Sequence, residues 1–132
     1  MSGPPAPPPV IEGTREITYQ EITANKQLEI LDVRTREEQE ETGVIPGAKL
    51  FSFKQMDSDL SLDDASFMSK YGFAKPSLDA PLVTHCGKGG RARRAYNLLH
   101  EKGFTNHRLY AGSFQDWVKN GGDVVKPEYP KQ

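Results

Sequence analysis

A short apolar segment at residues 81–85 is followed at once by a cysteine, a glycine-rich loop and a helical pattern. The segment carries Leu82 and Val83, and its length and its position between turn signals favour a buried strand. From Arg91 onward apolar side chains recur at helical spacing, namely Ala92, Ala95, Tyr96, Leu98 and Leu99. A buried strand that leads directly into a helix favours an α/β fold with a mainly parallel sheet.

The rest of the chain alternates short apolar runs with helical stretches in the same way. Strands are predicted at 16–19, 28–33, 49–53, 81–85 and 107–110. Two helices are predicted at 19–25 and 36–42, a third carries Phe67, Met68 and Tyr71 and ends at Gly72, a fourth runs from Arg91 to Lys102, and a fifth contains Phe114, Trp117 and Val118 and ends at Gly121. Thr35, Ser61 and Ser113 are predicted to cap the second, third and fifth of these helices. The predicted fold is therefore a central, mainly parallel, five-stranded sheet with helices on both faces.

The length of 132 residues leaves room for one domain. Residues 1–13 are rich in proline and are predicted to form a disordered tail. Their PxxP spacing also fits a ligand for a proline-binding partner, but a plain tail is favoured because no Arg or Lys lies close. Residues 14–125 are predicted to form the domain, and residues 126–132 a C-terminal arm.

The formal net charge is -1, with 17 Lys and Arg against 18 Asp and Glu, which argues against nucleic acid as the main partner. The apolar runs are too short to cross a membrane. With one cysteine, the chain is expected to have no internal disulfide, no structural zinc site and no cofactor. A cytosolic location is favoured over a mitochondrial one, because the N-terminal residues lack the pattern of a secretory signal and the first arginine is Arg15.

The cysteine, Cys86, stands between a predicted strand and a predicted helix, where backbone N–H groups converge. Such a turn binds anions, and N–H groups and cations favour the nucleophilic thiolate form of a cysteine. A lone cysteine is more often a small buried hydrophobe, but the flexible glycines and the local basic charge favour a nucleophile here. The candidate site residues are Cys86, Gly87, Lys88, Gly89, Gly90 and Arg91.

Two other interpretations of this loop are weaker. His85 ends the strand, so its side chain is expected on the opposite face from Cys86, and a structural role is favoured over that of a general base. The loop also lacks the Ser or Thr that follows the lysine in a nucleotide-binding P-loop. Nucleotide binding is therefore not expected.

Four motifs, in order along the chain, resemble the rhodanese, or thiosulfate sulfurtransferase, family. They are Leu31-Asp-Val-Arg34, Gly43-Val-Ile-Pro-Gly-Ala48, Cys86-Gly-Lys-Gly-Gly-Arg91 and Tyr110-Ala-Gly-Ser-Phe-Gln-Asp-Trp117. The resemblance covers residues 16–125 and is greatest to the small single-domain sulfurtransferases of animals. It implies that Cys86 takes the outer sulfur of thiosulfate as a persulfide and passes it to a second nucleophile.

The resemblance also implies roles for the neighbouring residues. Lys88 is assigned to the sulfonate end of the donor, while Arg91 either binds an oxyanion or holds loop carbonyls. Arg34 lies at the carboxyl end of a predicted strand, where α/β sheets place their sites. It is kept as a substrate-binding candidate, with an internal ion pair to Asp32 as the alternative.

The expected partners are a small anionic sulfur donor and a thiol acceptor, such as glutathione or a protein thiol, or else cyanide. A cysteine phosphatase or arsenate reductase is disfavoured, because only four residues separate Cys86 from Arg91 and a phosphatase loop has one more. A non-catalytic rhodanese-like binding module is the alternative from another class. It usually lacks the cysteine, which is present here.

Overall fold

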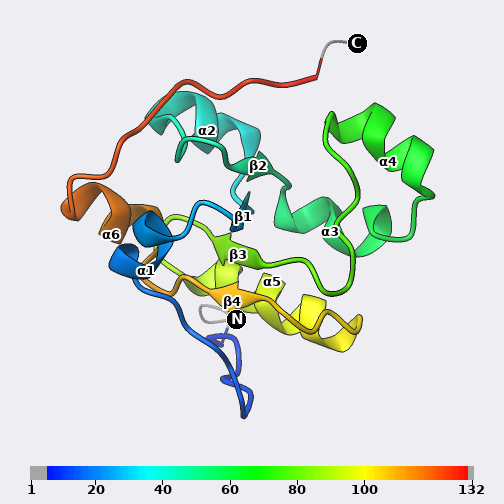
Figure 1. Ribbon diagram of the computed structural model, residues 1–132, viewed down its shortest axis with the longest axis horizontal. Coiled ribbons are helices and arrows are strands. Elements are labelled where there is room, and N and C mark those ends of the chain that lie inside the picture. Colours follow the sequence, from blue (N-terminus) through cyan, green and yellow to red (C-terminus); the bar gives the residue numbers. More distant parts are fainter. Residues whose placement is uncertain (1–5, 131–132) are drawn as a thin grey trace, which may run out of the picture.

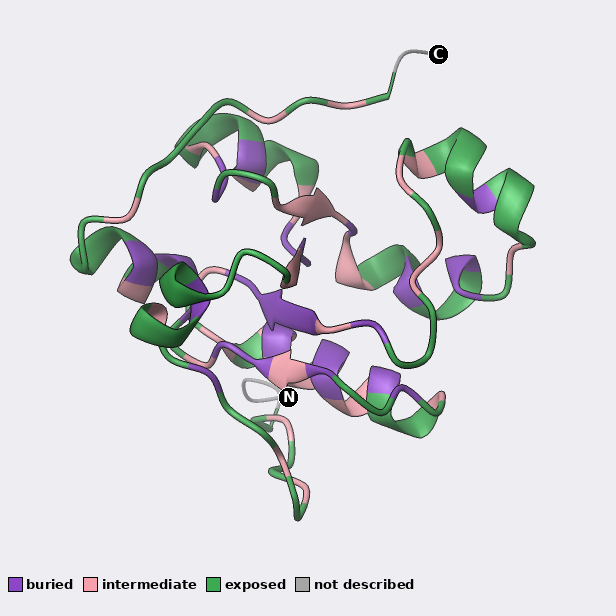
Figure 2. Cartoon of the chain, viewed as in Figure 1, coloured by how far each residue is buried: buried purple, intermediate pink, exposed green. Residues whose placement is uncertain are grey.

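The computed structural model of the chain describes residues 6–130. Its four strands form one parallel sheet in the order β2-β1-β3-β4 (Figure 1). They are β1 (Glu29–Asp32), β2 (Lys49–Leu50), β3 (Leu82–His85) and β4 (Arg108–Leu109). The predicted α/β class and parallel sheet are thereby confirmed. β3 is buried throughout and lies between β1 and β4 (Figure 2).

The sheet has four strands rather than the five that were predicted. The missing strand, expected at 16–19, is reduced to a single parallel bridge between Glu16 and Leu109. The cause is local: Thr18 and Glu21 form a capping box, in which each side chain bonds the backbone N–H of the other residue. This capping box starts a helix at Tyr19, so too little extended chain is left for a strand.

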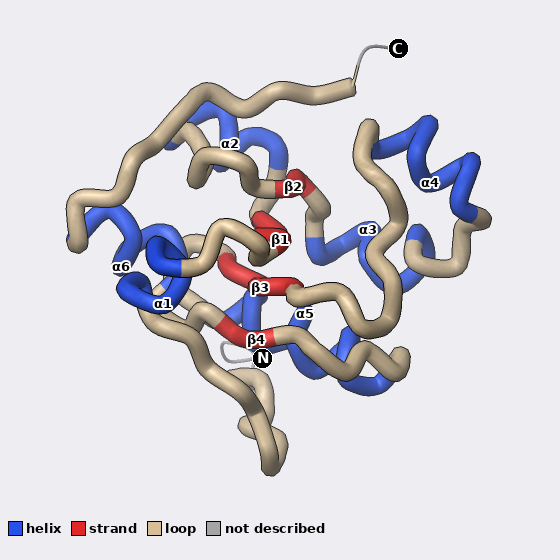
Figure 3. Tube along the Cα trace, in the orientation of Figure 1, coloured by secondary structure: helices blue, strands red, loops and turns tan. Residues whose placement is uncertain are grey.

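Helices flank the sheet on both faces, and residues 6–130 contain six of them (Figure 3). They are α1 (Tyr19–Ala24), α2 (Arg36–Thr42), α3 (Phe53–Asp59), α4 (Asp64–Tyr71), α5 (Gly90–Glu101) and α6 (Ser113–Lys119). One core cluster joins α3, α4 and α5 to the sheet, and a second joins α1 and α6 to it. No helix within residues 6–130 is long and apolar enough to cross a membrane.

The predicted cap of the helix at 36–42 is confirmed, because the Thr35 side chain accepts the backbone N–H of Glu38 at the start of α2. Ser61 does not cap α4; the side chain of Asp63 accepts the N–H of Ser66 at 2.7 Å instead. The predicted strand at 49–53 ends early, at Leu50, because Phe53 begins α3. Phe53 and Met56 are helically spaced and pack in or against the core, which explains this extra helix.

Residues 125–130, most of which belong to the predicted C-terminal arm, lie along α2 (Figure 1). Val44 and Val125 exchange two backbone hydrogen bonds, of 2.8 and 2.9 Å. Farther along, the Tyr129 hydroxyl donates to Oε1 of Gln39 at 3.0 Å, and the guanidinium of Arg36 lies over the Tyr129 ring. The arm thus adds contacts on the outer side of α2, the helix that reaches the loop after β3.

Candidate active site

Cys86 follows β3 directly and lies at the carboxyl edge of the sheet, before the first turn of α5. Its side chain is buried, with 1% of its surface exposed. The backbone N–H of Gly89 donates to Sγ at 3.0 Å. Gly89 has a φ of 112°, and a Cβ at this position would lie 2.4 Å from the carbonyl oxygen of Ala111. Glycine is therefore required at the residue whose N–H contacts the sulfur.

The first turn of α6 binds the loop that begins at Cys86. The N–H groups of Phe114 and Gln115 donate to the carbonyl oxygens of Cys86 and Gly87, at 2.9 and 3.0 Å. Ser113 Oγ accepts the N–H of Cys86 at 3.0 Å. These bonds turn the carbonyls of the loop toward α6, while the N–H of Gly89 turns toward the sulfur.

Ser113 was predicted to cap α6, and that prediction is wrong. Its side chain makes no capping bond and instead bridges two loops, because Oγ also donates to the carbonyl of Tyr110 at 2.9 Å. Ser113 has a φ of 56°, a left-handed conformation that is uncommon for a residue with a side chain. This backbone conformation accompanies the bond to Cys86, and no sequence pattern marks it.

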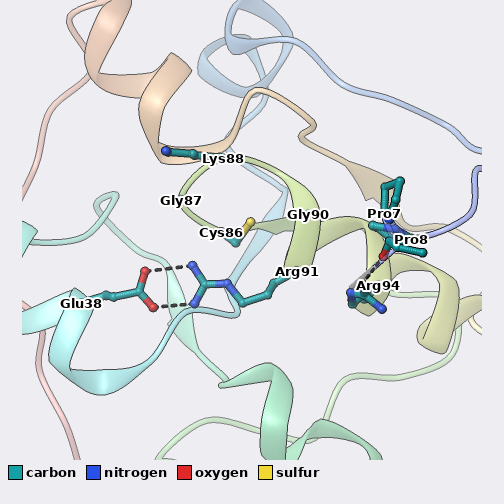
Figure 4. Close-up of a pocket in the computed structure, with 10 residues that line it drawn as sticks. Pro7, Pro8, Glu38, Cys86, Gly87, Lys88, Gly90, Arg91 and Arg94 are labelled. Carbon is teal, nitrogen blue, oxygen red and sulfur yellow. Dashed lines mark hydrogen bonds and ion pairs between the residues drawn. The ribbon is translucent and has the colours of Figure 1, made fainter. Parts of the chain in front are cut away.

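A cavity of about 550 Å³ opens beside Cys86 (Figure 4). The predicted residues Cys86, Gly87, Lys88, Gly90 and Arg91 all line it. The remaining lining residues are Ala6, Pro7, Pro8, Glu38 and Arg94. Lys88 is exposed and takes part in no ion pair with the residues of 6–130. Positive charge exceeds negative charge in this lining, which suits an anionic ligand.

Arg91 is bound by a residue that the sequence analysis did not identify. Its guanidinium forms a two-point ion pair with Glu38 on α2, and Nη2 lies 2.8 Å from Oε2. The hydrogen bond from Arg91, together with the bonds from Thr35, lowers the pKa of Glu38 to about 2 in spite of partial burial. The parallel pairing of β1 with β3 brings α2 and the loop to the same edge of the sheet. This shared edge was the one feature from which Glu38 could have been identified as a neighbour of Arg91.

Arg34 is not brought into the cavity. Its guanidinium is buried and donates to the carboxylate of Asp32, to Thr42 Oγ1 and to the carbonyl of Gly43, at 2.8–3.3 Å. The Phe114 ring lies 4.2 Å from its central carbon. The donors of Arg34 are thus occupied by the protein itself, as in the alternative of an internal ion pair with Asp32.

His85 is fully buried on the far side of the same strand end. Its Nδ1 lies 3.2 Å from the carbonyl oxygen of Cys86. Burial lowers the pKa of His85, against the opposing effect of Asp32, so the imidazole is neutral at physiological pH. The ring does not line the cavity and packs beneath the loop.

Comparison with known proteins agrees with this geometry. Residues 14–120 match the model of the rhodanese-like domain. A human thiosulfate:glutathione sulfurtransferase is 35% identical over 99 residues, covering 74% of this chain and 85% of the relative. A Drosophila melanogaster rhodanese domain-containing protein is 33% identical over 93 residues, covering 70% and 84%.

Solved structures show the same similarity. The human single-domain sulfurtransferase TSTD1 superposes with a TM-score of 0.76 at 32% identity, covering 81% of this chain and 97% of that one. A single-domain sulfurtransferase of Saccharomyces cerevisiae superposes with a TM-score of 0.75 at 28% identity, covering 89% and 99%.

Proposed function

Because the chain belongs to the rhodanese-like domain family, we propose that it is a sulfurtransferase that carries a sulfane sulfur on Cys86 from thiosulfate to a thiol acceptor. The observation that carries the proposal is the contact of Sγ with the Gly89 N–H, beside a cavity whose lining has more positive than negative charge and which lies at the N-terminus of α5. A relative named thiosulfate sulfurtransferase supports thiosulfate as the sulfur donor. Two relatives named thiosulfate:glutathione sulfurtransferase support a thiol as the acceptor.

In the first half-reaction, the Cys86 thiolate attacks the outer sulfur of thiosulfate. An Sγ–S bond forms, the S–S bond of thiosulfate breaks, and its electron pair leaves with sulfite. The negative charge moves from the thiolate to the new terminal sulfur, beside the Gly89 N–H and the cations of the cavity lining. Lys88 is free to bind the sulfonate, whereas Arg91 is oriented by Glu38 and contributes its charge from a fixed position.

In the second half-reaction, an acceptor thiolate attacks the terminal sulfur of the persulfide. The persulfide S–S bond breaks, Cys86 leaves as the thiolate, and the acceptor carries the sulfur away as its own persulfide. The chain has one cysteine, so no second thiol within it can resolve the persulfide, and discharge requires an external acceptor.

The test is release of sulfite from thiosulfate in the presence of cyanide or glutathione. Wild-type protein is expected to release sulfite continuously, and Cys86→Ser is expected to release none while melting at the same temperature as wild type. Turnover by the serine variant would remove Cys86 from the mechanism. A folded wild-type protein that released no sulfite with either acceptor would favour a non-catalytic binding module.

A further inference from the structure

Residues 6–9 lie along α5 at the mouth of the Cys86 cavity (Figure 4). Ala6, Pro7 and Pro8 form part of the cavity lining. Two side chains of α5 hold this segment: Arg94 Nη2 donates to the carbonyl of Ala6 at 2.9 Å, and Asn97 Nδ2 donates to the carbonyl of Pro9 at 2.9 Å. Residues 6–8 of the predicted tail therefore line the candidate active site, whereas its residues 1–5 lie outside the described part of the chain.

The chain that follows this segment is anchored to the domain. Ile11 packs against the main core cluster, and Thr14 closes a turn by donating from N and Oγ1 to the Ile11 carbonyl. The Arg15 N–H then donates to the Tyr96 hydroxyl at 3.0 Å. Proline has a fixed φ and no N–H, so residues 7–9 offer only carbonyls, and one of these accepts from α5. The segment is thus a short, conformationally restricted strip between two fixed points.

We propose that residues 6–9 act as a wall that determines acceptor specificity, admitting low-molecular-weight thiols to Cys86 and excluding thiols carried on folded proteins. The proposal rests on the proposed function for the identity of the reaction. Cys86 is almost fully buried, and it is reached through a cavity of about 550 Å³, a size typical of small-molecule sites. A folded protein would have to displace this wall in order to bring its sulfur within bonding distance.

The charge of the cavity narrows the class of thiol further. Lys88, Arg91 and Arg94 line it with only Glu38 opposing them among the described residues, and Glu38 is already paired with Arg91. A small thiol that carries carboxylates fits this balance better than a neutral or cationic one. The wall itself lies before residues 14–120, the part of the chain that matches the family model.

The wall can be tested without reference to catalysis, because the chain has a single cysteine. The rate of alkylation of Cys86 is measured with iodoacetamide and with a maleimide coupled to a large polyethylene glycol. The variants are Asn97→Ala, which removes one tether without changing the cavity lining, and the double variant Arg94→Ala/Asn97→Ala. Glu101→Gln, an exposed change at the end of α5, is the matched control.

The ratio of the two alkylation rates cancels any change in thiol reactivity, so it reports access alone. Loss of one hydrogen bond is expected to raise the relative rate of the bulky reagent by up to about tenfold in Asn97→Ala, and by more in the double variant. Glu101→Gln is expected to match wild type. If the ratio of the two alkylation rates in the tether variants equals that of wild type, residues 6–9 do not restrict access to Cys86 and the proposal is wrong.

A second measurement links the wall to acceptor choice. The Cys86 persulfide is discharged to glutathione and, separately, to a reduced thioredoxin-class protein. In the tether variants, the rate of discharge to the protein thiol is expected to rise relative to the rate of discharge to glutathione. If the ratio of these two rates is the same as in wild type, residues 6–9 do not determine acceptor specificity. If alkylation responds as expected but wild type forms no persulfide with thiosulfate, the wall stands as a size filter and the proposed function fails.

Discussion

Glu38 on α2 and Arg91 on α5 are joined by a two-point ion pair beside Cys86, with Nη2 2.8 Å from Oε2. The same Glu38 carboxylate accepts the N–H of Thr35 at 3.1 Å and so caps its own helix. One side chain therefore fixes the start of α2 and the direction of the Arg91 guanidinium. This arrangement links the acidic helix after β1 to the loop after β3.

The ion pair predicts a pH dependence of stability. The pKa of Glu38 is lowered from 4.5 to about 2, so its contribution is fully present above pH 4.5 and is lost as the pH falls toward 2. Because both side chains are more than a third exposed, Glu38→Gln is expected to cost about 1 kcal/mol or less at pH 7. In urea unfolding, the difference in the free energy of unfolding between wild type and Glu38→Gln should be smaller at pH 3 than at pH 7.

The control for this prediction is Glu40→Gln on the same helix, which breaks the exposed pair with Arg36. It is expected to change stability little at either pH. A gap for Glu38→Gln that is the same at pH 7 and pH 3 would contradict the assignment of the carboxylate as the titrating group.

Two neighbouring glycines should respond differently to the same change. Gly89→Ala places a Cβ against the Ala111 carbonyl at a left-handed φ, and it is expected to cost about 1–3 kcal/mol and to disturb the N–H contact with Sγ. Gly90→Ala meets open space at the start of α5 and is expected to be tolerated. Chemical denaturation and the rate of persulfide formation measure both effects, and equal responses of the two variants would contradict this account.

Ser113 is expected to position Cys86 through hydrogen bonding. Ser113→Ala leaves the buried N–H of Cys86 without its partner, which costs about 1–3 kcal/mol, and persulfide formation should slow in the folded protein. Ser113→Gly relieves the left-handed backbone but removes the same hydroxyl. Both variants should therefore form persulfide slowly, whereas recovery in the glycine variant would mean that backbone conformation alone matters.

Lys88 and Arg34 were both predicted from the sequence to bind substrate, but substitutions at the two positions should affect the KM for thiosulfate differently. Lys88→Ala is expected to raise the KM for thiosulfate about three- to tenfold, with persulfide discharge unchanged, because Lys88 lines the cavity and forms no ion pair with any described residue. Arg34→Lys is expected to lower the melting temperature with the KM unchanged, because Arg34 serves the buried pair with Asp32. A raised KM in Arg34→Lys alone would reverse the two roles.

Local patterns were enough to predict the strand, loop and helix around Cys86, because buried strands, glycine turns and helical spacing are encoded by adjacent residues. Contacts between distant segments were not predictable in this way. Glu38 and Arg91 are 53 positions apart, and they meet only because the parallel sheet brings α2 to the loop.

The remaining differences have related causes. Arg34 sits where site residues are expected, but its donors are taken by Asp32, Thr42 and Gly43, and only packing reveals this. The prolines at 7–9 have little side-chain capacity for a core, yet the segment is held through its carbonyls, which every residue carries. The composition of residues 1–13 gives no information about such bonds.

The most direct measurement is the intact mass of the protein after reaction with thiosulfate alone, so that only the first half-reaction can occur. The account predicts a gain of one sulfur atom, located on Cys86 by peptide mapping, absent in Cys86→Ser and removed by glutathione. An unchanged mass for folded protein with a reduced thiol would contradict the central claim, as would added sulfur on any residue other than Cys86.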